Sequence, residues 1–145
     1  MKERNYFIDT NIFLRALLGD EEKTLEDCLR LLRGIKNGKI KAVTSNLVLA
    51  EVNWMLLKFY KFSKEDVVRS LNSILSLRHL KINDDFNPIL AVRLYKDYSI
   101  KFIDALIASN PEIFNKERTV VSYDKDFDKL GDLRVEPKEI IKTKK

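Results

Sequence analysis

Short, strongly apolar runs alternate along this chain with longer segments of helical periodicity. The clearest run, residues 6–8, ends directly at Asp9 and is followed by the small polar residues Thr10 and Asn11. Shorter or more mixed segments that also indicate strands recur at residues 41–44, 79–82, 119–122 and 133–135. Strands that alternate with helices build parallel sheets covered by helices on both faces. The pattern therefore predicts an α/β protein, a three-layer α/β/α arrangement around a mostly parallel sheet of about five short strands.

Apolar residues at helical spacing predict the helices between these runs. The expected segments are residues 12–18, 21–36, 47–60, 64–77, 84–98, 101–109 and a short helix that stops at Gly131. The helix at 47–60 is apolar on nearly every side, which predicts burial on two faces, against the sheet and against another element or a second subunit. Residues 1–145 suit a single domain, with a solvated basic tail at about 138–145.

Composition removes several classes of function. Cys28 is the single cysteine, so an internal disulfide and a thiolate metal cluster are excluded, and its helical face predicts a buried structural thiol. His79 is the single histidine, which excludes a paired-histidine ribonuclease. The four glycines form no dinucleotide or P-loop fingerprint. Acid–base or metal chemistry in this chain must rest on carboxylates.

Charge and hydropathy point to the kind of partner. The formal net charge is +5 and the pI is near 9.2, which favours a polyanionic partner such as nucleic acid. No apolar run approaches the ~20 residues of a membrane span. Polar residues also interrupt the amino-terminal run that a signal peptide would need. We expect a cytoplasmic protein with no membrane partner.

Four acids occupy positions that are predicted to be buried, where an ordinary solvent-exposed charge is not expected. Asp9 and Asp124 each follow a predicted buried strand, and Glu51 and Asp104 each interrupt an apolar helical surface. Each alone could be a helix cap, a first-turn acid or half of a salt bridge. Together, converging buried carboxylates repel one another and need cations. Hard divalent cations with oxygen ligands are the natural choice, and they support phosphodiester cleavage.

The order of the motifs resembles that of PIN domains, in particular the VapC-like ribonucleases. The motifs are Ile-Asp-Thr-Asn at 8–11, Leu-Ala-Glu at 49–51, Phe-Ile-Asp-Ala-Leu-Ile-Ala at 102–108 and Val-Ser-Tyr-Asp-Lys-Asp-Phe at 121–127. Each motif is weak alone, but four in order at compatible spacing span essentially the whole chain. The resemblance implies a Mg²⁺- or Mn²⁺-dependent endoribonuclease. It also implies the toxin role in a VapBC-like pair, with an antitoxin partner and a homodimer.

The resemblance also implies roles for individual residues. Asp9 and Asp104 are the first choices as direct metal ligands. Glu51 would hold a water of the ion's shell or help to deprotonate it, and Asp124 would complete the quartet.

Further positions are expected to support this quartet. Asn11 and Ser122 match small polar positions beside the acids, and Thr10 or Asn11 could cap the helix and leave Asp9 free for metal. Asp126 could substitute for Asp124 or support it, and Asp128 is a more distant candidate. The RNA would be cut in single-stranded or loop regions.

Other readings of the same residues remain open. A haloacid-dehalogenase-like phosphatase also begins with a strand that ends in Asp, but it needs a second Asp where this chain has Asn11. A receiver domain would want an acidic pair after the first strand and a phospho-accepting Asp in mid-chain. A PIN-like module that binds RNA or protein without catalysis is the alternative of a different class.

Overall fold

A five-stranded, fully parallel sheet forms the centre of the computed structural model, which describes residues 4–143. The strands lie in the order β3-β2-β1-β4-β5. Their bounds are β1 (Asn5–Ile8), β2 (Ala42–Thr44), β3 (Leu80–Ile82), β4 (Arg118–Val121) and β5 (Arg134–Val135). The predicted fold class is confirmed.

The two central strands are buried on both faces. Phe7, Ile8, Val120 and Val121 have no exposed surface, as expected of a parallel sheet whose faces are both covered by helices. Ile8 is paired with Val121 in the register of β1 and β4. The residues that follow these two strands therefore emerge side by side.

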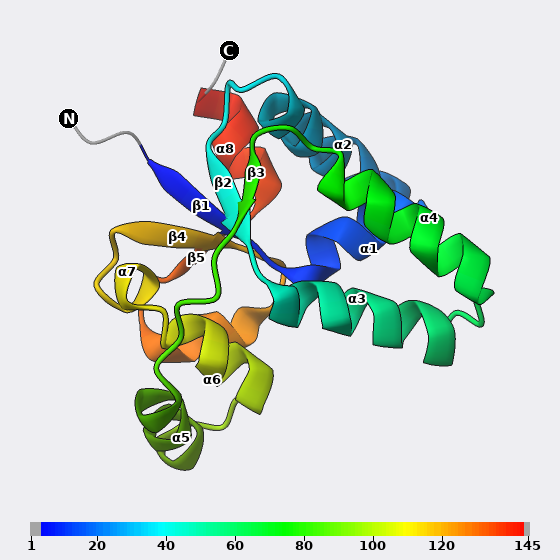
Figure 1. Ribbon diagram of the computed structural model, residues 1–145. Helices are drawn as coiled ribbons and strands as arrows, with labels where there is room; N and C mark the ends of the chain where they lie inside the picture. Colours follow the sequence, from blue (N-terminus) through cyan, green and yellow to red (C-terminus); the bar gives the residue numbers. More distant parts are fainter. Residues whose placement is uncertain (1–3, 144–145) are drawn as a thin grey trace.

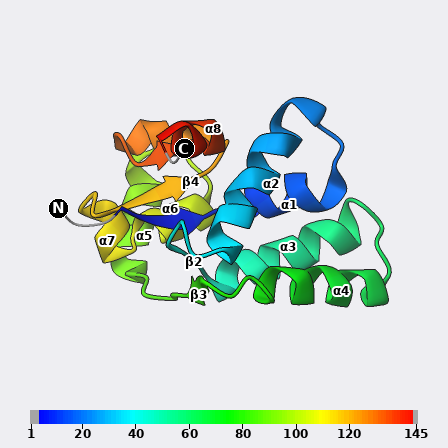
Figure 2. The ribbon, with the colours of Figure 1, turned by 90° about the horizontal axis from the view of Figure 1, so that it is seen from above.

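Eight α-helices and one 3-10 helix surround the sheet in the described part of the chain. They are α1 (Thr10–Leu18), α2 (Glu22–Lys36), α3 (Asn46–Lys58), α4 (Lys64–Leu75), α5 (Pro88–Asp97), α6 (Phe102–Ala108), α7 (Pro111–Phe114), η1 (Lys125–Leu130) and α8 (Pro137–Thr143). In Figure 1, α2 and α8 lie on one side of the sheet and α5, α6 and α7 on the other. Figure 2 shows α1 to α4 gathered beyond the end of the sheet to which the β4 arrow points.

Local sequence accounts for the ends of several helices. Gly19 ends α1 in the left-handed conformation at φ 63°, where glycine carries no Cβ penalty. The side chains of Ser45, Ser63 and Asn87 accept hydrogen bonds from backbone N–H groups at the starts of α3, α4 and α5. Asn87 replaces the predicted start near residue 84, because Pro88 occupies the first helical position.

Two short helices differ from the sequence-based expectations. Beyond the end of α6, Pro111 opens α7, a short helix that the sequence pattern did not predict. The segment expected to be a solvated tail forms α8, which packs against α2 and buries Ile140 and Ile141. Two adjacent isoleucines among lysines are too short a pattern to show helical periodicity. Residues 144–145 of the expected tail lie outside the described residues.

Helix α3 is less enclosed than its apolar sequence predicted. Val48, Val52 and Leu56 form one fully buried face. Trp54 is 52% exposed and Phe59, directly after the helix, is 62% exposed. Within the described chain α3 packs against α1 and α4 with only one face fully buried, and contact of the other face with a second subunit stays a prediction. Over residues 4–143, no helix has the length and apolar character needed to cross a membrane.

Candidate active site

The carboxyl ends of β1 and β4 create the first part of the site. Asp9 follows β1, and its backbone N–H donates to the carbonyl of Val121 at 3.1 Å. Ser122 follows β4, and its Oγ donates to Oδ2 of Asp9 at 2.6 Å. Both side chains are almost completely buried. Ligand sites in open α/β sheets lie at this edge.

Asp9 is itself the cap of helix α1. Its Oδ1 accepts the Thr10 N–H at 2.8 Å, with an extended backbone at Asp9. The expectation that Thr10 or Asn11 would cap the helix is wrong, because the helical conformation already begins at Thr10. Asn11 instead donates from Nδ2 to Ser122 Oγ at 2.9 Å and to Asp9 Oδ2 at 3.3 Å. Three of about four acceptor positions of the Asp9 carboxylate are thus used, and one stays open.

Asp104 lies in the first turn of α6 and is 3% exposed. Its Oδ2 is buried and accepts no hydrogen bond from the described residues. Lys101 places its Nζ 3.7 Å from this oxygen, an ion pair but too long for a good hydrogen bond. A buried carboxylate oxygen without a hydrogen-bond donor is costly, so the atom marks a position that a ligand could complete.

Asp124 and Asp126 converge on Asp104 from the start of η1. One oxygen of each of the three carboxylates lies within 4.8 Å of the others. Asp124 Oδ1 caps η1 by accepting the Asp126 N–H at 2.9 Å, and Asp124 Oδ2 accepts from Lys101 Nζ at 2.6 Å. The structure therefore brings both candidates for the fourth acid to the same place. Asp128 instead pairs with Arg134.

Glu51 reaches the site from α3. It is partly buried and lines a cavity of about 320 Å³ together with Asp9, Asp104 and Asp124. All four acids of the predicted quartet thus face one pocket. Trp54 and Phe59 line the same pocket, and their rings meet edge to face with centroids 5.2 Å apart.

Burial and mutual repulsion change the acidity of these groups. Burial raises the pKa of Asp104 to about 8, and the charges of Asp9 and Asp124 add to this effect. Burial also raises the pKa of Asp9 to about 6, against the hydrogen bonds from Ser122 and Thr10. Burial would raise the pKa of Asp124 too, but the Lys101 hydrogen bond lowers it below its usual value. The cluster carries more negative charge than its surroundings stabilise.

This donor set fits a hard divalent cation. All the converging groups are carboxylates, which Mg²⁺ and Mn²⁺ accept as ligands. The Oδ2 of Asp104 accepts no hydrogen bond from the described residues, and burial raises the pKa values of Asp9 and Asp104, so a bound cation would stabilise their charged forms. Asp104, Asp124 and Asp126 are near enough to share one ion, and Asp9 faces the same pocket.

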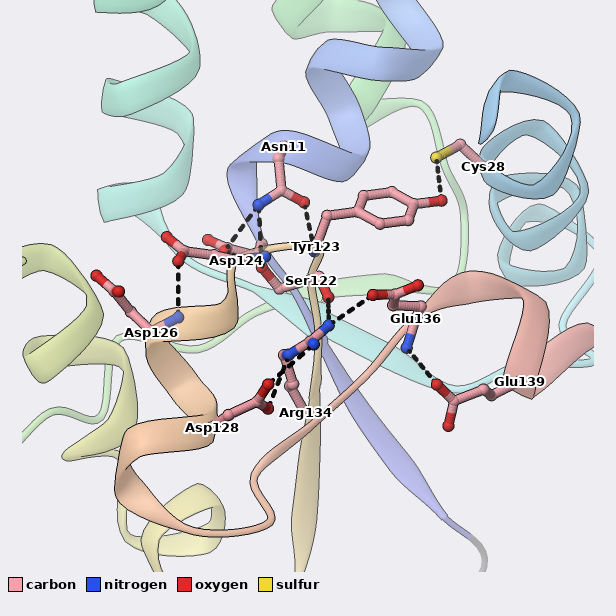
Figure 3. Close-up of polar contacts among 11 residues, drawn as sticks. Asn11, Cys28, Ser122, Tyr123, Asp124, Asp126, Asp128, Arg134, Glu136 and Glu139 are labelled. Carbon is pink, nitrogen blue, oxygen red and sulfur yellow. Dashed lines mark hydrogen bonds and ion pairs between the residues drawn. The ribbon is translucent and has the colours of Figure 1, made fainter. Parts of the chain in front are cut away.

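Arg134 holds the loop that carries Asp124. Its guanidinium donates to both carboxylate oxygens of Asp128, to Glu136 and to the carbonyl of Ser122 at 3.1 Å, as Figure 3 shows. The Arg134 side chain is 11% exposed. Sequence reasoning missed this residue and Lys101, because neither has a local pattern that reveals its distant partners.

Tyr123 anchors the same loop on its other side. Its backbone N–H donates to Asn11 Oδ1 at 3.1 Å, and its hydroxyl lies 3.6 Å from Cys28 Sγ (Figure 3). The guanidinium of Arg15 stacks 4.1 Å from the centre of the Tyr123 ring. Cys28 is fully buried, which confirms the burial predicted for its thiol.

The chain belongs to the PIN domain family. The model of that family matches residues 6–133, which include all four predicted acids. This assignment confirms the resemblance of the four motifs and removes the phosphatase and receiver readings.

Individual relatives agree with the assignment. The chain is 28% identical to a VapC ribonuclease of Aquifex aeolicus, over 91% of this chain and 96% of the relative. Among solved structures it is similar to VapBC2 of Rickettsia felis bound to a promoter DNA fragment. That match has 25% identity, a TM-score of 0.65, and covers 91% of this chain and 97% of the other. A Pyrobaculum aerophilum protein, at 14% identity and TM-score 0.67, shares the fold over 97% of this chain and 94% of its own. The chain is thus a VapC-like PIN protein.

Proposed function

We propose that this protein is a divalent-metal-dependent endoribonuclease and the toxin component of a VapBC-like pair. The observation that carries the proposal is the convergence of Asp104, Asp124 and Asp126, with the buried Oδ2 of Asp104 left without a hydrogen-bond donor among the described residues. The similarity to a VapC ribonuclease supports the same activity.

Asp104 and Asp124 would hold the cation, with Asp9 or Asp126 completing its protein ligands. A bound Mg²⁺ or Mn²⁺ would supply Lewis-acid stabilisation of charge on the phosphodiester and help to activate water. The protein's own contribution is orientation. Ser122 and the Thr10 N–H fix the carboxylate of Asp9. Glu51 lines the same pocket, and we propose that it would take a proton from an attacking water.

The substrate we propose is RNA in single-stranded or loop regions. Trp54 and Phe59 present exposed ring surface in the same pocket as the acids. Unpaired bases stack on such side chains, whereas bases within a duplex are not available to them. The net charge of +5 favours association with a polyanion.

We propose two protein partners. The similarity to a VapBC2 complex supports a cognate antitoxin. A homodimer is supported by an apolar stripe on α5, where Ile89, Val92 and Tyr95 are each more than half exposed. Light scattering tests the dimer, and a particle of the monomer mass, 17.0 kDa, at micromolar concentration would contradict it.

Cleavage of a mixed RNA pool tests the enzymatic proposal. We expect cutting with Mn²⁺ that stops with EDTA and falls at least about a hundredfold in Asp104→Asn. Asp97→Asn, an exposed acid at the end of α5, is the matched control and should retain activity. Cutting that survives both EDTA and Asp104→Asn would exclude the carboxylate–metal site. RNA binding without cleavage would favour the non-catalytic alternative.

A further inference from the structure

Lys101 spans the acidic cluster at the start of α6. Its Nζ donates to Asp124 Oδ2 at 2.6 Å and lies 3.7 Å from Asp104 Oδ2. These two oxygens come from residues 20 positions apart in the chain. Lys101 also lines the pocket that contains all four predicted acids. One ammonium group therefore stands between the carboxylates that would hold a divalent cation.

The Lys101 side chain is largely exposed, whereas its two partners are buried or nearly so. It is 63% exposed, whereas the side chains of Asp104 and Asp124 are 4% and 17% exposed. Lysine carries a compact charge on a flexible four-carbon stem, so it can leave without disturbing packing. The carboxylates cannot leave, because burial and the η1 cap hold them.

We infer that Lys101 is a displaceable counter-cation, which neutralises the Asp104–Asp124 pair in the metal-free protein and must withdraw when a divalent cation binds. The inference rests on the proposed metal site. The ammonium already takes an acceptor position on Asp124 Oδ2, and its positive charge would repel a divalent cation held by the same carboxylates. Lys101 therefore lowers the affinity for metal and stabilises the metal-free fold.

Titration of the protein with Mn²⁺, followed by electron paramagnetic resonance of the free ion, tests the competition directly. Lys101→Met keeps most of the side-chain length but removes the charge, and we expect Mn²⁺ to bind roughly tenfold more tightly. Lys101→Arg keeps the charge and should stay within about threefold of the unmodified protein. Lys125→Met removes an exposed charge beside the same loop and controls for net charge.

Thermal unfolding supplies a second readout that also checks folding. In EDTA, Lys101→Met should unfold at a lower temperature than the unmodified protein, since its carboxylates lose their counter-charge. With saturating Mn²⁺ the two should converge. The metal-induced rise in unfolding temperature is therefore larger in the variant. A variant that is equally destabilised with and without Mn²⁺ would indicate a purely structural lysine and overturn the inference.

The outcomes separate this inference from the proposed function. If the unmodified protein binds Mn²⁺, Asp104→Asn does not, and Lys101→Met binds equally or more weakly, the counter-cation role is wrong and the metal site stands. If neither the unmodified protein nor Lys101→Met binds Mn²⁺, both proposals fail. If Lys101→Met binds Mn²⁺ and the unmodified protein does not, Lys101 blocks the site completely in the unmodified protein, which supports the inference.

Discussion

Ser122 Oγ donates to Asp9 Oδ2 at 2.6 Å, which joins the ends of two neighbouring strands through one short contact. The same hydroxyl oxygen accepts from Asn11 Nδ2 at 2.9 Å and from the Asp124 N–H at 3.0 Å. One buried serine therefore orients two of the four acids.

Removal of this hydroxyl should leave the Asp9 carboxylate and the backbone of Asp124 without a hydrogen bond that orients them. We expect Ser122→Ala to lower the free energy of unfolding by roughly 1–3 kcal/mol, because buried partners lose their hydrogen bonds. It should also weaken Mn²⁺ binding, since Asp9 loses a donor that favours its charged form. Urea unfolding and a Mn²⁺ titration measure the two effects. Ser76→Ala, on an exposed helix end, is the control, and equal effects in both variants would contradict this role.

The metal-free protein should lose stability as the pH rises. The pKa values of Asp9 and Asp104 are raised in the fold, from 3.8 to about 6 and about 8. The folded state therefore binds more protons than the unfolded chain between about pH 4 and pH 8, and stability falls across that window. In EDTA at pH 8, Asp104→Asn should be more stable than the unmodified protein by roughly 1–3 kcal/mol.

Unfolding curves in EDTA at pH 5.5, 7 and 8 measure this trend. The advantage of Asp104→Asn should shrink toward pH 5.5, where Asp104 is protonated in the unmodified protein. Mn²⁺ should stabilise the unmodified protein and not the variant. A pH-independent difference between the two proteins would show that charge repulsion at Asp104 is not its cause.

Arg134 should contribute more to the free energy of unfolding than an exposed arginine does. Arg134→Met leaves Asp128, Glu136 and the Ser122 carbonyl without their shared donor. We expect a loss of roughly 1–3 kcal/mol of unfolding free energy. The control Arg69→Met breaks exposed pairs on α4 and should cost less than about 1 kcal/mol. Similar costs in urea unfolding would refute the proposed support.

Replacement of Trp54 should weaken RNA binding and leave the affinity for Mn²⁺ unchanged. Trp54→Ala removes ring surface that lines the pocket. The test combines it with Asp104→Asn, so that the RNA is not cleaved during the measurement. Binding of a single-stranded RNA should then weaken by about five- to a hundredfold. Mn²⁺ affinity, measured without Asp104→Asn, should not change. Phe114→Ala, an exposed aromatic of α7 outside this pocket, is the control. Unchanged RNA binding in Trp54→Ala would contradict the stacking role.

The sequence predicted the parts of the fold that depend on local pattern. Apolar pairs such as Phe7-Ile8 and Val120-Val121 located the two central strands, because helices cover both faces of the sheet there. The positions of Asp9 and Asp124 after such strands, and of Asp104 and Glu51 on apolar helices, were enough to predict that they face one pocket.

The remaining features of the site depend on contacts between residues that are far apart in the sequence. Asp9 both caps α1 and faces the pocket, because the helix begins at Thr10, two residues before the first apolar residue of its pattern. The exposure of Trp54 depends on which neighbours α3 has in space, which its own sequence does not contain. Lys101 and Arg134 act through partners that the fold brings together.

The most direct measurement is the location of Mn²⁺ in crystals of the protein, from its anomalous scattering. We expect a peak within coordinating distance, about 2.0–2.4 Å, of Asp104 Oδ2, which accepts no hydrogen bond from the described residues. The peak should be absent from crystals of Asp104→Asn grown alike. A peak bound elsewhere, or no peak at this pocket at millimolar Mn²⁺, would contradict the assignment of these carboxylates to a metal-dependent nuclease.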